Sequence, residues 1–201
     1  MPPTSRSRLL ALAHRKGAFR ARDARRAGIH SQDITRLVTA GELERVARGQ
    51  YRLADLPVTE SHALVLAAQA APRGVICLLS ALTVHGIGTQ LPADVWIAIA
   101  RGARAPRVTM IPLRVVHFSG AAFTHGIERR RLEGADVRVY SVAKTLADLF
   151  KLRNQVGLDL ALEALREGWR DRKFTIQALD DAARVCRVER VMRPYVEAVI
   201  G

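Results

Sequence analysis

Residues 41–53, GELERVARGQYRL, predict a β-hairpin. Apolar side chains stand on both arms and can pack toward a core, with Leu43 and Val46 before the turn and Tyr51 and Leu53 after it. Gly49 supplies the permissive backbone that a tight turn needs. The polar residues of the stretch are then left for its outer surface.

Three of these polar residues suggest what the hairpin contacts. We expect Arg48 and Arg52 to point outward, where guanidinium groups can reach phosphates, and Gln50 to lie at the tip. The arginines of an ordinary hairpin are also solvated. The hairpin pattern alone therefore does not identify a ligand.

Three short helices are predicted before the hairpin. Thr4 or Ser5 can cap the first helix, which Gly17 ends. The second covers about residues 21–27, and the third runs from an N-cap at Ser31 to about residue 40. Helices followed by a hairpin with a basic tip predict a winged helix-turn-helix, which is a DNA-binding arrangement.

The third predicted helix has two distinct faces. Ile34, Leu37 and Val38 follow the spacing of a buried face. The opposite face is polar and able to reach base edges, because arginine pairs with guanine and glutamine with adenine in the major groove. That face comprises Gln32, Thr35, Arg36 and Thr39. A merely solvated helix shows the same pattern, so both interpretations stay open for this helix by itself.

The distribution of charge favours the nucleic-acid interpretation. The 201 residues carry a formal net charge of +13, and residues 1–53 hold 12 basic against 4 acidic side chains, a net +8. A basic excess concentrated at one end is typical of a nucleic-acid footprint. We therefore predict that this segment binds double-stranded DNA. The residues expected to position or read the duplex are Arg22, Ser31, Gln32, Thr35, Arg36, Thr39, Arg48, Gln50 and Arg52.

A domain boundary is predicted near Pro57, which breaks the last strand of the hairpin. We expect a winged helix-turn-helix domain over residues 1–55 and a second domain over residues 56–201. Strands are predicted at 75–78, 95–100, 113–118, 127–132 and 137–140. Helices are predicted at 59–70, 80–85, 141–152, 156–169, 175–186 and 188–200. Strands followed by helices make the fold class α+β, with a mixed α/β domain that ends in a helical segment.

Several other classes of protein are disfavoured. Cys77 and Cys186 stand far apart in apolar surroundings, which predicts reduced, buried thiols in a cytoplasmic protein. Neither a histidine and cysteine spacing typical of metal sites nor a glycine-rich phosphate loop occurs. No segment approaches the roughly 18 apolar residues of a membrane span. We expect no metal, no cofactor and no membrane as partner.

One pattern invites an enzymatic interpretation. Ser141 and Lys144 have the S-x-x-K spacing of some serine acyl enzymes. Ser141 is better explained as a helix N-cap, with Lys144 exposed and paired to Asp148 on the helix surface. His85, beside Gly86, is expected to bond the terminal carbonyls of its own helix. No catalytic residues are therefore predicted, and a hydrolase or nuclease is the third hypothesis.

The sequence resembles the AbiEi family, the antitoxin partner of type IV toxin-antitoxin systems. The resemblance rests on residues 19–24 (FRARDA), 41–53, 80–87 (SALTVHGI) and 141–148 (SVAKTLAD). It implies a winged helix that represses its own operon and a C-terminal domain that counters a nucleotidyltransferase-like toxin.

The leading hypothesis is accordingly a DNA-binding antitoxin and autorepressor that binds inverted repeats in its own promoter as two copies. The alternative is a stand-alone winged-helix regulator whose C-terminal domain senses a small ligand.

Overall fold

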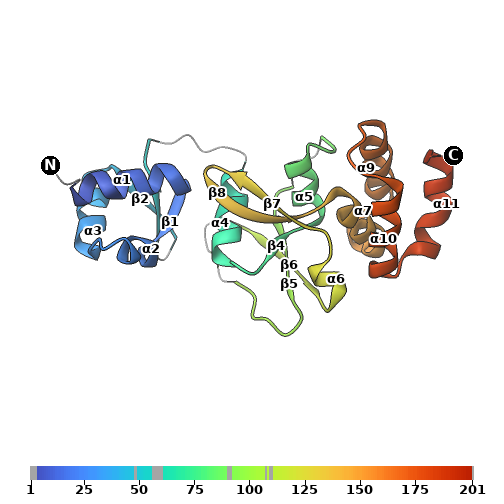
Figure 1. Ribbon diagram of the computed structural model, residues 1–201, viewed down its shortest axis with the longest axis horizontal. Coiled ribbons are helices and arrows are strands. Elements are labelled where there is room, and N and C mark those ends of the chain that lie inside the picture. The colour runs from blue at the N-terminus through green and yellow to red at the C-terminus, as the bar shows by residue number, and fades with distance from the viewer. Residues whose placement is uncertain are drawn as a thin grey trace.

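The computed structural model describes residues 4–47, 49–55, 61–89, 92–106, 108 and 111–200. The molecule is elongated, with α1 and α3 at one end, a mixed sheet in the middle and α9, α10 and α11 at the other end (Figure 1). We call residues 4–55 the winged helix and residues 61–200 the C-terminal part. The predicted boundary at Pro57 lies outside the described residues.

The winged helix has the predicted order of helices and hairpin. Its elements are α1 (Ser5–Lys16), β1 (Ala18–Arg20), α2 (Ala21–Arg26), α3 (Ser31–Thr39), β2 (Leu43–Ala47) and β3 (Gln50–Leu53). The three strands form an antiparallel sheet in the order β1-β3-β2. The sequence pattern does not predict β1, because a strand of three residues is too short to show a period and depends on its pairing with β3.

Local signals explain where these helices begin and end. The Thr4 hydroxyl accepts a hydrogen bond from the backbone N–H of Ser7 and so caps α1, as predicted. The prediction of an N-cap at Ser31 is wrong: Ser31 is already helical, and His30 precedes it without a side-chain cap. Just beyond the end of α3, Gly41 has a φ of +70°, and the N–H of Glu42 donates to the carbonyl of Leu37 at 3.0 Å. This left-handed turn ends the helical segment that contains α3.

The core of the winged helix comes from residues on all of these elements. Its large members include Leu9, Phe19, Ile34, Leu37, Leu43 and Leu53. The ring of Tyr51 packs on that of Phe19, with 5.9 Å between their centroids. The hydrophobic pattern on both hairpin arms therefore has the predicted role.

The C-terminal part is built on a five-stranded sheet in the order β6-β5-β4-β8-β7. The strands are β4 (Val75–Ile76), β5 (Val95–Ala100), β6 (Leu113–Phe118), β7 (Ile127–Leu132) and β8 (Ala135–Tyr140). The pairs β4–β8 and β5–β6 are parallel, whereas β4–β5 and β7–β8 are antiparallel. The helices are α4 (His62–Ala70), α5 (Leu78–His85), α6 (Ala121–Thr124), α7 (Val142–Lys151), α8 (Arg153–Val156), α9 (Leu158–Arg170), α10 (Ile176–Cys186) and α11 (Glu189–Ile200). The predicted α+β fold class is confirmed.

Two predicted element boundaries are wrong near the start of the sheet. The strand expected at 75–78 ends at Ile76, and Leu78, with a φ of +49°, already opens α5. Ser80 therefore does not begin the helix; its buried hydroxyl accepts a hydrogen bond from the N–H of Trp96 at 2.9 Å. Thr59, the expected start of the preceding helix, lies outside the described residues.

The three-stranded sheet of the winged helix turns one face to its own core and packs the other face against the C-terminal part. Ala18 of β1 belongs to one buried cluster with Val65 of α4 and Val137 of β8. The side chain of Gln69 donates a hydrogen bond to the carbonyl of Ala18 at 2.6 Å. The turn between β7 and β8 lies against the end of α1, because a Cβ built on Gly17 would stand 1.9 Å from the carbonyl oxygen of Glu133. The winged helix is thus covered on one side and free on the other.

Candidate nucleic-acid interface

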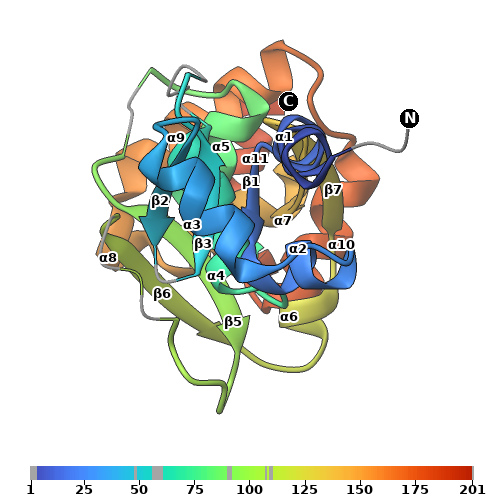
Figure 2. The same cartoon turned by 90° about the vertical axis from the view of Figure 1, so that its left-hand side faces the viewer.

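Helix α3 carries the predicted recognition face at the free end of the molecule. Viewed along the long axis from the winged-helix end, α3 lies in front (Figure 2). Ile34 and Leu37 are buried in the core, whereas the predicted contact residues of this helix are all exposed. Those residues are Ser31, Gln32, Thr35, Arg36 and Thr39. The structure therefore brings five of the nine predicted residues together on one open surface.

The side chains of this face remain available for a ligand. Arg36 is 81% exposed, and its Nη1 lies 3.9 Å from a carboxylate oxygen of Asp33, an exposed ion pair of little strength. The Thr35 hydroxyl donates to the carbonyl of Ser31 at 3.2 Å. Gln32 makes no side-chain hydrogen bond to any other described residue. This face can insert into a major groove without first breaking a strong internal contact.

The outward orientation predicted for Arg52 is wrong, and Gln50, predicted at the tip of the hairpin, is buried as well. Their exposed fractions are 7% for Arg52 and 6% for Gln50. Arg52 lies opposite Ala18 in the sheet, on the face that packs against the C-terminal part. Its guanidinium group forms an ion pair with Glu44, its partner on β2. Strand alternation separates the two faces correctly, but it does not reveal that the polar face is covered.

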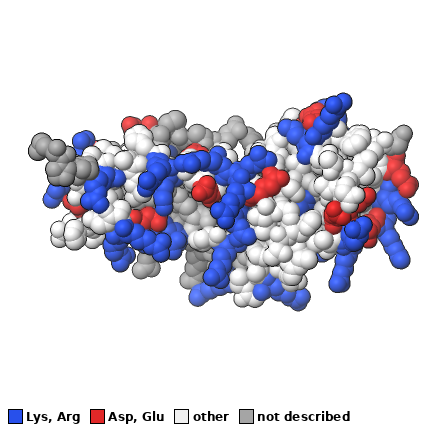
Figure 3. Space-filling view, viewed as in Figure 1, with Lys and Arg blue, Asp and Glu red and all other residues white. Residues whose placement is uncertain are grey.

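The remaining two predicted residues have different outcomes. Arg48 lies outside the described residues. Arg22 is exposed in the first turn of α2 but lines a cavity that faces the C-terminal part. Two exposed arginines that the sequence reasoning did not select, Arg25 and Arg26, stand on the last turn of α2, just before the turn into α3. Their doubled basic pattern was the available signal. Basic side chains recur over the winged helix in the view of Figure 3.

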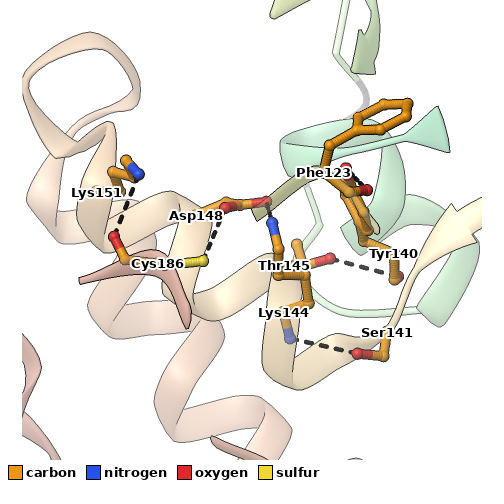
Figure 4. A network of polar contacts seen from close by, with 8 residues as sticks. All are labelled: Phe123, Tyr140, Ser141, Lys144, Thr145, Asp148, Lys151 and Cys186. Carbon is orange, nitrogen blue, oxygen red and sulfur yellow. Dashed lines mark hydrogen bonds and ion pairs between the residues drawn. The ribbon is translucent and has the colours of Figure 1, made fainter. Parts of the chain in front are cut away.

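A second polar cluster is buried in the C-terminal part (Figure 4). The Nζ of Lys144 donates to an oxygen of Asp148 at 2.5 Å, and both side chains are fully buried, so the predicted surface pair is wrong. The ammonium group also lies 4.1 Å from the ring centroid of Tyr140. The Sγ of Cys186 donates to the other oxygen of Asp148 at 3.4 Å. Burial raises the pKa of Asp148, while Lys144 acts in the opposite direction.

This cluster does not have the geometry of an S-x-x-K enzyme. The hydroxyl of Ser141 accepts from the backbone N–H of Lys144 at 3.3 Å and caps α7, as predicted. The ammonium group of Lys144 is directed to Asp148 instead of Ser141 (Figure 4). Burial raises the pKa of the Cys186 thiol to about 12 and that of the Cys77 thiol well above its ordinary value. Both thiols are free and buried, as predicted, and burial favours their protonated form.

His85 has a structural partner different from the predicted one. Its Nε2 lies 2.7 Å from the carbonyl oxygen of Tyr140 in β8, not from the end of its own helix. Since a carbonyl only accepts, this nitrogen carries the proton. Burial lowers the pKa of His85, which favours the neutral ring. Gly86, which adopts the left-handed conformation, caps the C-terminal end of α5 instead of the His85 side chain.

Among the described residues, no group of three or more His, Cys, Asp or Glu side chains could hold a metal ion. No helix in the described part of the chain has the length and apolar character that crossing a membrane requires.

Comparisons with known proteins support the assignment of the winged helix. Residues 7–54 match the family described as "Transcriptional regulator, AbiEi antitoxin". This match confirms the resemblance over the winged helix and supports a general role in transcriptional regulation. No functionally curated protein matches the sequence.

A structural similarity to a known protein extends beyond residues 7–54. The crystal structure of the RV2827C protein from Mycobacterium tuberculosis is similar, with a TM-score of 0.62 over 96% of this chain and 78% of that chain. The two sequences are 15% identical, so the likeness concerns the fold alone.

Proposed function

We propose, on the premise that residues 7–54 are those of an AbiEi-type transcriptional regulator, that the protein is a DNA-binding antitoxin and autorepressor. The observation that carries the proposal is the exposed polar face of α3, held by a buried apolar face at the free end of the molecule. In this proposal, the protein acts in the cytoplasm, carries out no catalysis and counters a nucleotidyltransferase-like toxin.

The binding mode follows from the residues on α3. Gln32 and Arg36 would read base edges in the major groove, since their side chains form bidentate pairs with adenine and guanine. Ser31, Thr35 and Thr39 would add contacts around them. Arg25 and Arg26, on the adjoining turn, are placed to meet phosphates. Two copies on inverted repeats would present two such helices about one helical turn apart.

Substitutions on α3 test this reading of bases. We expect Arg36→Ala to weaken binding to the protein's own promoter by about 1–3 kcal/mol and to relax preference at one base pair. The measurement is fluorescence anisotropy with promoter duplexes that carry single base changes. Arg166→Ala, an exposed arginine on α9 at the other end of the molecule, is the matched control. If the unaltered protein does not bind a duplex of its own promoter at low ionic strength, the proposal is wrong.

Arg48 tests the complementary role of phosphate contacts. Its neutralisation should weaken binding equally on all sequences and lower the slope of log affinity against log salt by about one. A base-specific effect of Arg48→Gln would contradict this division between phosphate contact and base reading.

The antitoxin activity needs a separate experiment in cells. If a nucleotidyltransferase gene lies directly downstream, its expression should arrest growth and expression of this protein should restore it. The double variant Gln32→Ala with Arg36→Ala should lose promoter repression and keep growth rescue. Failure of the intact protein to restore growth would leave only the regulator.

A further inference from the structure

A cavity of about 280 Å³ lies where the winged helix meets the C-terminal part. One wall comes from the end of α1, β1 and the start of α2, and the other from α4 and the β7–β8 hairpin. Its charged lining residues are Lys16, Arg20, Arg22, Asp23, Asp136 and Arg138. The cavity therefore has walls from both halves of the chain.

The charges in this lining do not balance. Lys16 is paired with Asp23 at 3.4 Å. Arg20, Arg22 and Arg138 form no ion pair with any described residue, and Arg138 instead donates to the backbone carbonyl of Arg73 at 2.8 Å. Three guanidinium groups thus line one open cavity without a carboxylate bound to any of them. Such a surface attracts an anion.

Unpartnered polar atoms mark the same junction. The Nε of Arg20 and the Oε1 of Gln69 are buried, and neither has a hydrogen-bond partner among the described residues. The Oε1 of Gln50, whose residue pairs with Arg20 across β1 and β3, is also buried without such a partner, but Gln50 is not among the lining residues of the cavity. Buried polar groups are nearly always hydrogen-bonded. Of these three atoms, only the Nε of Arg20 is a donor on the cavity lining, so it is the one that can bind an oxyanion.

We propose that this cavity binds a small organic anion through a phosphate or carboxylate group held by Arg20, Arg22 and Arg138. Guanidinium groups match both oxyanions through paired N–H donors. The volume lies just below the range of about 300–1,000 Å³ that is typical of drug-sized ligands, so a metabolite of modest size fits. Since both walls contribute, the bound anion joins the winged helix to the C-terminal part. This inference is independent of the promoter and of a toxin.

Titration of the full-length protein tests the site. The probes are inorganic phosphate and citrate, used separately, with sodium chloride adjusted to keep the ionic strength constant. We expect saturable binding of one anion per chain by calorimetry, together with a rise in melting temperature. Failure of both probes to exceed sodium chloride in either measurement would overturn the proposal.

Variants locate the binding. Arg138→Gln and Arg22→Gln should each weaken the anion about tenfold or more, because each removes a charge-assisted hydrogen bond. Arg166→Gln changes the net charge equally on exposed α9 and should leave the affinity unchanged. Equal weakening by all three variants would show general charge attraction and contradict a built site.

Competition with DNA separates this inference from the proposed function. Phosphate should bind equally well in the presence of a short promoter duplex. Displacement by the duplex would assign the guanidinium groups to the DNA backbone and overturn the small-anion site. If phosphate binds but the promoter does not, the proposed function fails and the anion site stands.

Discussion

The Lys144–Asp148 pair shows how burial changes what two residues contribute. An exposed pair four residues apart on a helix is worth a few tenths of a kcal/mol. Here both side chains are fully buried, and Cys186 and two aromatic rings surround the charges. Removing one member would leave the other charged and without its partner in an apolar core.

Lys144→Met tests this burial. We expect the free energy of unfolding to fall by about 3–5 kcal/mol, because the carboxylate of Asp148 loses its buried partner. Urea unfolding followed by circular dichroism measures the change. Arg193→Met is the control. Arg193 and Glu197 are also four residues apart on a helix, but their ion pair, with 3.7 Å between Nε and Oε1, lies on the surface. Comparable losses from both variants would contradict the contrast.

His85 predicts how stability depends on pH. Its pKa in the folded state is lowered from 6.5 by burial, so the unfolded chain binds a proton that the folded chain does not. The stability contributed by neutral His85 is present above pH 6.5 and is lost as the pH falls below it. Urea unfolding at about pH 7.5 and about pH 5.5 should show a smaller loss in His85→Gln than in the unaltered protein. An equal loss would exclude His85 as the source.

At the scale of elements, the predictability of the fold depended on whether local pattern and tertiary contact agreed. The strands at 95–100 and 113–118 were predicted with their observed bounds, because each is an apolar run between turn or charged residues. The observed bounds of α3 lie within a residue of the predicted ones, and the face that the pattern predicts as polar is exposed. Leu78 broke the pattern, since an apolar residue that continues a strand run adopts a left-handed φ and begins a helix.

Strand β3 shows the limit of the same reasoning at the candidate site. Alternation places Gln50 and Arg52 opposite the core of the winged helix, which is correct. The covering of that face depends on α4 and β8, which are distant in sequence, and no period within the hairpin reports it. The fold class and the exposed polar face of α3 were therefore predictable from the sequence, whereas the burial of the polar residues of β3 was not.

Arg52→Gln tests the structural role of this strand. We expect the free energy of unfolding to fall by about 1–3 kcal/mol, because the charge-assisted bond to Glu44 is lost on a covered face. Thermal and urea unfolding provide the measurement. The promoter affinity of the folded variant should equal that of the unaltered protein. A uniform loss of DNA affinity without loss of stability would instead restore Arg52 to the interface.

At the scale of the whole molecule, the two halves approach each other closely at Gly17 and Glu133. A Cβ at Gly17 would meet the carbonyl of Glu133, whereas a Cβ at Gly88 would meet nothing within 4 Å. Both glycines have a positive φ, so alanine strains the backbone at both positions. Gly88→Ala therefore serves as the control for the cost of placing alanine at a positive φ without a neighbouring atom.

Gly17→Ala should therefore destabilise the protein more than Gly88→Ala does. We expect a further loss of about 1–3 kcal/mol in the free energy of unfolding, the usual cost of forcing an extra carbon into a packed site. Urea unfolding of the two variants gives the comparison. Equal losses would mean that the contact between α1 and the β7–β8 turn contributes little.

In the proposed complex with DNA, the placement of α3 and α11 at opposite ends of an elongated body has a consequence for the binding of a further partner. A chain seated on duplex by its first end leaves its far helices in open solvent. Another macromolecule can dock there without competing for the same space, so repression and a second engagement need not be mutually exclusive.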